Sequence, residues 1–148
     1  MTYNHTQQVP VPVLGVAAAL GTAVAMLTPG RFAKPAMLAL VAGSAFTMRS
    51  LTVTVDDTFI ELQFGGWWTA KRILLSDVLE CTITRTTFLN GWGIHYTGDG
   101  WLYNVYGLDA VELILKGGAK VIIGTDEPSE LSAAIRALTV NASQHKVP

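Results

Sequence analysis

The stretch from Val9 to Thr28, VPVPVLGVAAALGTAVAMLT, is 20 residues long and contains no charged side chain. A helix of this length can cross a bilayer, because it rises about 1.5 Å per residue and the hydrocarbon core is about 30 Å thick. Pro10 and Pro12 fit the first turn of such a helix, where a missing N–H removes no hydrogen bond. The stretch therefore predicts a membrane-spanning helix.

A second apolar stretch follows at residues 36–48, after a turn that contains Pro29, Gly30 and Pro35. This stretch is short for a span, and it includes Lys34 if it is counted from Phe32. We expect a transmembrane helical hairpin over residues 9–49. A half-inserted or interfacial second helix is the alternative.

Small side chains recur every four residues on both predicted helices, a spacing that lets helices approach closely in lipid. They are Gly15, Ala17, Gly21 and Ala25 on the first helix, and Ala39 and Gly43 on the second. We expect them to form the packing face between the two helices. The alternative is a chance spacing in alanine-rich segments.

The charges divide the chain at residue 50. Residues 1–50 hold three basic side chains and no acidic one, whereas residues 51–148 hold the other seven basic residues and all eleven acidic ones, a net charge of −4. An acidic domain without a basic stripe argues against nucleic acid as a partner. Residues 1–8 are polar and uncharged, which predicts a disordered start.

From Leu51 the apolar residues alternate with a period of two, which indicates strands. The predicted strands cover residues 51–55, 58–64, 70–75, 78–86, 101–107, 110–116 and 119–124, and a short additional strand is expected around residues 93–96. Asp56-Asp57 and Gly117-Gly118 suit tight turns between them. We expect about seven antiparallel strands in meander order, closed into a barrel.

One amphipathic helix is predicted after the strands. Thr125 to Pro128 provide a cap and a proline for its first turn, and Leu131, Ala134, Ile135 and Leu138 form one apolar stripe. The helix would close the open end of the barrel in a domain of residues 50–140, and residues 141–148 would form a flexible tail. The pleckstrin-homology superfold has this order of elements.

Residues 75–131 also resemble a known group of proteins. GWGIHYTGDGWLYNVYGLDAVEL at 91–113 and GTDEP at 124–128 are similar to bacterial membrane proteins with a pleckstrin-homology-like domain, a family of largely unassigned function. The resemblance covers residues 51–138. It implies a binding or scaffolding module, sometimes oligomeric, at the bacterial inner membrane.

The spacing of the glycines, histidines and the cysteine does not match known motifs for catalysis, cofactor binding or metal binding. Gly91, Gly93 and Gly98 do not fit a dinucleotide-binding loop, because Tyr96 occupies the third glycine position. His95 is more simply a loop histidine with a local hydrogen bond than a ligand or base. Cys81 is the single cysteine and lies in an alternating run, which favours a buried structural thiol. No catalytic, cofactor or metal site is predicted.

Two loops are predicted to reach the bilayer surface. A first strand that leaves the membrane after Arg49 must be followed by one that returns, so the turn at Gly65 to Trp68 comes back to the lipid. Tryptophans favour the interfacial belt, and basic groups gain from anionic lipid. The predicted contact residues are Trp67, Trp68, Lys71, Arg72, Phe88, Leu89 and Trp92. Alternatively, the tryptophans plug the barrel or fill an oligomer interface.

These patterns predict a non-enzymatic, membrane-anchored binding or scaffolding module, multi-pass in the inner membrane, with its domain seated on the cytoplasmic bilayer surface. Its partners would be the lipid bilayer and further copies of itself or another membrane protein. Asp56-Asp57 occupies the loop in which phosphoinositide-binding relatives carry basic residues, so we do not expect that ligand. The alternative function is a structural subunit of a homo-oligomer built through the hairpin and the barrel edges.

Overall fold

The computed structural model describes residues 2–87 and 91–144, with side chains described up to residue 140. Its helices are α1 (Val11–Leu27), α2 (Ala33–Thr47) and α3 (Pro128–Gln144), and a 3₁₀ turn, η1, covers Leu75–Asp77. Its strands are β1 (Tyr3–Gln8), β2 (Ser50–Val55), β3 (Phe59–Phe64), β4 (Trp68–Leu74), β5 (Val78–Arg85), β6 (Gly93–Tyr96), β7 (Trp101–Asn104), β8 (Asp109–Leu115) and β9 (Lys120–Gly124).

Strand β1 was not expected, because residues 1–8 lack alternating apolar side chains. It pairs antiparallel with β2, from Tyr3 opposite Val55 to Gln8 opposite Ser50. Polar side chains make contacts across the two strands in place of apolar ones. For example, Asn4 Nδ2 donates a hydrogen bond to Thr54 Oγ1 at 2.9 Å. The prediction of disorder is therefore wrong for residues 3–8.

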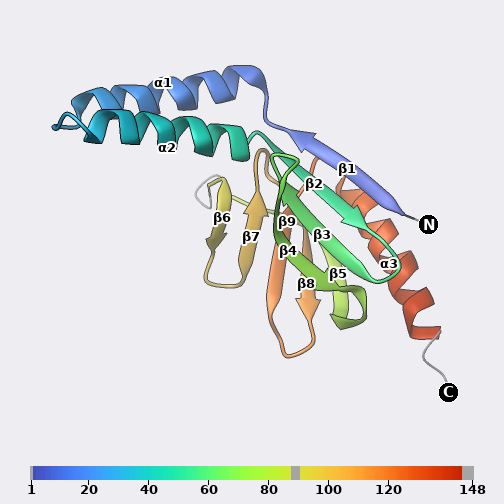
Figure 1. Cartoon of the computed structure of the whole chain (residues 1–148). Coiled ribbons are helices and arrows are strands. Elements are labelled where there is room, and N and C mark those ends of the chain that lie inside the picture. The colour runs from blue at the N-terminus through green and yellow to red at the C-terminus, as the bar shows by residue number, and fades with distance from the viewer. Residues whose placement is uncertain (1, 88–90, 145–148) are drawn as a thin grey trace.

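Helices α1 and α2 form the expected helical hairpin, and they stand between β1 and β2 in the chain (Figure 1). The two helices contain 17 and 15 residues, because the chain leaves the helical conformation at Thr28 and reaches it again only at Ala33. Within residues 2–87 and 91–144, no helix combines the length and the hydropathy needed to cross a membrane. This finding contradicts the predicted transmembrane hairpin and the multi-pass localisation.

The strands form two sheets instead of one closed barrel, so the predicted barrel is wrong. The first sheet has the order β1-β2-β3-β4 and the second the order β5-β8-β9-β7-β6. The turn η1 carries the chain from the first sheet to the second. The meander order fails as well, because β9 lies between β8 and β7 and runs parallel to β7, with Trp101 opposite Val121. Local alternation carries no information about such a long-range pairing.

One apolar core joins both sheets and α3. It contains Val53 and Leu62 of the first sheet, Val111 and Leu113 of the second, and Leu131, Ile135 and Leu138 of α3. Helix α3 covers β5, β8 and η1 (Figure 1), so the predicted amphipathic helix is confirmed, but it packs on the second sheet instead of closing a barrel. The helix continues to Gln144, and residues 141–144 therefore belong to it and not to the expected flexible tail.

Candidate functional site

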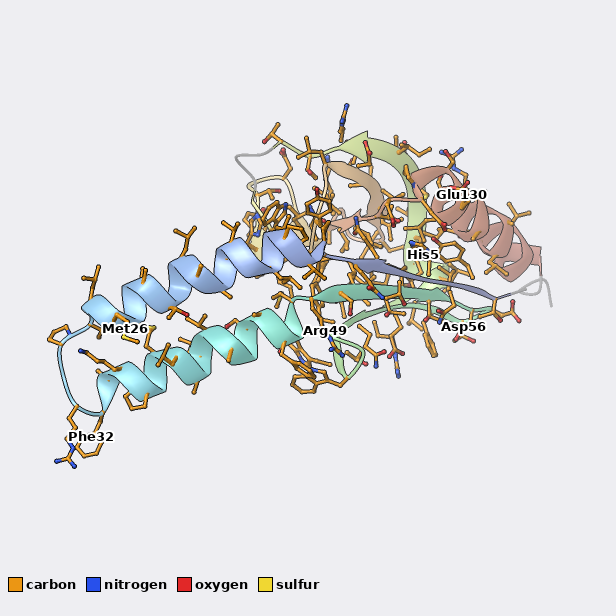
Figure 2. All side chains as sticks on the ribbon, turned by 90° about the horizontal axis from the view of Figure 1, so that it is seen from above. His5, Met26, Phe32, Arg49, Asp56 and Glu130 are labelled. Atoms are coloured by element: carbon orange, nitrogen blue, oxygen red, sulfur yellow. The ribbon has the colours of Figure 1, made fainter. Side chains whose placement is uncertain are left out.

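The helical hairpin carries the largest group of exposed apolar side chains. Figure 2 shows it standing out from the two sheets, with Phe32 at its far end and Arg49 at its root. Leu27 and Phe32, at the far turn, keep 84% and 82% of their surface exposed. The other large exposed apolar residues of the hairpin are Val11, Val16, Leu20, Val24, Met26, Leu40 and Phe46. Exposed apolar surfaces of this kind are typical of interaction sites.

Only part of the predicted small-residue face lies between the helices. A side chain at Gly21 would meet Val41 Cγ1 at 2.8 Å, and Ala25 is fully buried. The other four predicted residues are exposed: Gly15, Ala17, Ala39 and Gly43. The helices therefore approach each other most closely around Gly21, while the remaining small residues face outward.

The turn between β3 and β4 returns to the root of the hairpin, as predicted for Trp67 and Trp68. The N–H of Gly65 donates to the Ser50 carbonyl at 2.9 Å, and Arg49 Nη2 donates to the Gly65 carbonyl at 3.4 Å. Gly65 and Gly66 have φ values of 63° and 79°, which glycine adopts without strain. Trp67 remains 61% exposed and Trp68 40%. The Trp67 indole thus lies beside the point where α2 ends, whereas the Trp68 ring packs near Phe64, with the ring centroids 6.1 Å apart.

Trp92 reaches the same root from the second sheet. Its ring lies on Tyr106, with the ring centroids 5.7 Å apart. Together with α1 and α2 it lines an apolar groove of about 390 Å³, in which Ser44 supplies the one polar side chain. A second groove, of about 680 Å³, runs along α2 between Trp67 and Trp92. Phe88 and Leu89, predicted to act with Trp92, lie outside the described residues.

Lys71 and Arg72 are not gathered at the root. They lie three and four residues beyond Trp68 on β4, which runs away from the hairpin, so they are about 10 to 13 Å further along the sheet. Arg72 Nη2 is 2.7 Å from Glu61 Oε2, and its guanidinium lies 4.5 Å from the centre of the Phe59 ring. The fold therefore engages Arg72 in an ion pair that holds β4 to β3.

The Thr69 hydroxyl donates to Glu61 Oε1 at 2.7 Å, on the same carboxylate that Arg72 pairs with. This hydrogen bond and the Arg72 guanidinium lower the pKa of Glu61 below its ordinary value. The carboxylate is a structural link between two strands.

The structure also places Asp56, Cys81 and His95, which the sequence singled out. Asp56 Oδ1 accepts hydrogen bonds from the N–H groups of Thr58 and Phe59, both at 2.7 Å, and so closes the turn after β2. Burial raises the pKa of the Cys81 thiol, which confirms the predicted buried cysteine. His95 is half-buried on β6, and its Nε2 has no hydrogen-bond partner in the part of the chain that the structure describes.

Among residues 2–87 and 91–144, His, Cys, Asp and Glu form no group of three or more that could hold a metal ion. The grooves beside Trp92 were not predicted, because their walls come from residues that are distant in the sequence. The exposed apolar hairpin and the positions of Trp67 and Trp68 followed from the sequence.

No protein-family model matches this chain, and none of the curated proteins matches it either.

Proposed function

We propose that the protein is a non-enzymatic binding module that attaches to the surface of a lipid bilayer. The hairpin lodges at the boundary between headgroups and acyl chains without crossing the bilayer. The observation that carries this proposal is the exposed apolar surface of the hairpin, which includes both helices and the far turn. The boundary between headgroups and acyl chains can cover this surface along the whole length of both helices.

The aromatic residues at the root support attachment from the domain side. Trp67 and Trp92 line a groove at the base of the hairpin, Trp68 follows Trp67 at the start of β4, and all three remain partly exposed. Indole rings favour the interface between headgroups and water, because one edge is apolar and the N–H stays hydrated. Tryptophans at the root would hold the two sheets at the headgroups while the hairpin lies along the boundary between headgroups and acyl chains.

The charge of the hairpin also fits a lipid surface. Arg31, Lys34 and Arg49 are all exposed, and residues 1–50 contain no acidic side chain. Each basic group near an anionic bilayer contributes about 1 kcal/mol of attraction. The hairpin should therefore bind anionic vesicles more tightly than neutral ones.

Charged side chains also connect elements of the two sheets. Several form exposed pairs that join neighbouring strands or turns. They are Arg85 with Asp109, Lys116 with Asp77, and Lys120 with Glu112. Such pairs stabilise the fold modestly, and Arg85 and Glu112 line the same polar groove of about 260 Å³ together with Asp99.

The test is flotation of the protein with vesicles of phosphatidylcholine and of phosphatidylcholine mixed with phosphatidylglycerol. Leu20→Ser is compared with Leu79→Ser, because Leu20 is 65% exposed on the hairpin and Leu79 is 63% exposed on β5. We expect the wild type to float, most strongly with the anionic mixture. Leu20→Ser should bind the vesicles at least about tenfold more weakly, because an apolar contact of about 1.5–3 kcal/mol is lost. Leu79→Ser should float like the wild type. Equal loss in both variants, or no flotation of the wild type, would refute the attachment.

A second candidate is self-assembly through the outward small residues. A side chain added at Gly15 or at Gly43 would meet nothing within 4 Å, so the helix backbone is open to close approach by another helix. Light scattering on the lipid-free protein separates this candidate from the first. A defined oligomer that Gly15→Leu and Gly43→Leu dissociate would favour assembly, whereas an oligomer that both variants preserve would oppose it.

A further inference from the structure

The apolar groove of about 390 Å³ lies between the two helices of the hairpin and the second sheet. Val9 and Val105 line it from the side of the sheets, and both belong to the main core, with 7% and 3% of their surface exposed. Trp92 adds an aromatic wall. The groove is therefore built by the folded domain as well as by the hairpin, unlike the outward faces of α1 and α2.

The lining of this narrow groove suits a hydrocarbon chain. Leu14 of α1 and Val41 of α2 are among its aliphatic walls, and Ser44 supplies the one polar side chain. The two helices close on each other at Gly21, where an added side chain would be 2.8 Å from Val41 Cγ1. Small-molecule sites have volumes of about 300–1,000 Å³, so a groove at the small end of this range matches one acyl chain better than the two chains of a phospholipid.

The wider groove of about 680 Å³ joins the narrow one at the root of the hairpin. The two grooves share the residues Leu40, Ser44, Met48, Trp92 and Gly93. A side chain added at Gly93 would meet nothing within 4 Å, so this residue leaves space where the grooves meet. A ligand can therefore place its chain in the narrow groove and its head in the wider one.

A positive charge lies at the rim of the wider groove. Phe46 lines this groove, and the Arg49 guanidinium is 4.3 Å from the centre of the Phe46 ring. Arg49 Nη2 donates to the Gly65 carbonyl at 3.4 Å. Among the side chains that the structure describes, no carboxylate forms a salt bridge with Arg49. A guanidinium can bind a carboxylate through two parallel hydrogen bonds, so Arg49 is suited to an anionic head.

We propose that the joined grooves bind one molecule of a fatty acid, with its chain between α1, α2 and Trp92 and its carboxylate beside Arg49. This inference goes beyond attachment to a bilayer, because it concerns a single amphiphile taken up by the protein in solution. The two proposals can fail independently. Vesicles can bind the outward faces of the hairpin while the groove stays empty, and the groove can bind a fatty acid in a protein that does not float.

The test is a fluorescence titration of the lipid-free protein with dibromostearate, a fatty acid whose bromine atoms quench a tryptophan in direct contact. Trp67, Trp68 and Trp101 are replaced by phenylalanine, so that Trp92 is the single tryptophan. The fatty acid is kept below its micellar concentration, at about pH 8, where a carboxylate is ionised. We expect saturable quenching that ends at one fatty acid per protein. Quenching that rises without saturation, or no quenching, would overturn the proposal.

Ala18→Leu and Ala19→Leu form a matched pair in this single-tryptophan chain, because Ala18 lines the narrow groove and the neighbouring Ala19 is exposed outside it. Ala18→Leu should weaken binding at least about tenfold, since the leucine displaces two or more methylene groups and each contributes about fourfold to affinity. Ala19→Leu should not change the affinity. Equal affinities of the two variants would place the fatty acid elsewhere and overturn the site.

A second pair keeps the test independent of the folding of one variant. Ala45→Leu fills the groove from α2, whereas Ala42 is exposed on the same helix outside both grooves. Circular dichroism shows which variants retain their helices and strands. Ala45→Leu should lose affinity as Ala18→Leu does, and Ala42→Leu should keep it. Retained affinity in a folded Ala45→Leu would contradict the site.

Arg49→Gln tests the position of the carboxylate. It should weaken the binding of dibromostearate about threefold to fivefold, which is the effect of a partly exposed ion pair. The affinity for the uncharged methyl ester should stay unchanged. Arg31→Gln is the control, because Arg31 is also exposed and lies 6.0 Å from the Phe32 ring, but at the far turn of the hairpin. Equal losses for acid and ester, or equal effects of the two arginine variants, would overturn the role of Arg49.

Discussion

The backbone N–H of Val9 donates a hydrogen bond to the carbonyl oxygen of Arg49 over 2.9 Å. This bond continues the β1–β2 ladder by one step beyond Gln8 and Ser50, to the point where both strands become helices. The hairpin is thus an extension of a strand pair, and its root is tied to the core of the two sheets.

Val9→Ala should therefore destabilise the whole fold. Val9 is 7% exposed and belongs to the main core, so removing its two methyl groups should lower the free energy of unfolding by about 1–3 kcal/mol. Urea denaturation measures the change. Val11→Ala is the control, because Val11 is 80% exposed on the first turn of α1 and should change stability little. Equal effects of the two variants would show that the root is not part of the core.

Gly15 and Gly21 should respond in opposite ways to alanine. Gly15→Ala should stabilise α1 by about 0.5–1 kcal/mol, since alanine loses less backbone entropy and the added carbon meets nothing. Gly21→Ala should lack this gain or lose stability, because its methyl group would be 2.8 Å from Val41 Cγ1. Thermal unfolding compares the two variants. Recovery of the gain in Gly21→Ala combined with Val41→Ala would identify the contact, and a gain in Gly21→Ala alone would contradict it.

Gly124→Ala should test the parallel pairing of β7 and β9. A side chain at position 124 would overlap Asn104, whose own side chain is fully buried and donates from Nδ2 to the Gly107 carbonyl at 3.1 Å. We expect a loss of about 1–3 kcal/mol in denaturant unfolding, because the overlap must displace Asn104 or the end of β9. Gly118→Ala is unsuitable as a control, since Gly118 has a φ of 83°. Ala119→Gly, in the same hairpin, should change stability far less.

Glu61 should link stability to pH. The Thr69 hydroxyl and Arg72 lower its pKa from the ordinary value of 4.5, so the stabilisation is present above pH 4.5 and is lost as the pH falls through the lowered value. Thr69→Val should move the titration of the Glu61 carboxyl carbon, followed by NMR, back towards 4.5. Arg85→Gln should leave it in place, because Arg85 pairs with Asp109 instead. Titration of wild-type Glu61 at its ordinary pH would contradict the pairing.

The features that the sequence predicted correctly are those that depend on local periodicity, namely the positions of strands and turns. Alternation located the strands after Arg49 to within a few residues, and the breakers after Leu27 located the turn of the hairpin. The glycines at 117 and 118 were expected in a tight turn, and both have a positive φ. These features depend on neighbouring residues alone.

What the sequence did not predict depends on residues that are far apart. Strand β9 pairs with β7, although β8 lies between them in the sequence. Strand β1 forms because the side chains of Asn4 and Thr6 hydrogen-bond to those of Thr54 and Thr52 on the neighbouring strand. The length of α1 was overestimated because an uncharged stretch was taken to be helical throughout, whereas Val9 and Thr28 adopt extended or turn conformations at its ends. Apolar length alone therefore gave the wrong membrane topology.

Quenching of single-tryptophan variants by brominated phospholipid tests the central claim most directly. Trp92 lies at the root of the hairpin, whereas Trp101 lies at the opposite end of the β6–β7 pair, about 13 Å away along the strands. The two indoles are comparably exposed, at 45% and 49%. On anionic vesicles, the account predicts strong quenching of a chain that retains only Trp92, and weak quenching of one that retains only Trp101. Equal quenching of the two tryptophans, or no quenching of either one, would contradict attachment through the hairpin root.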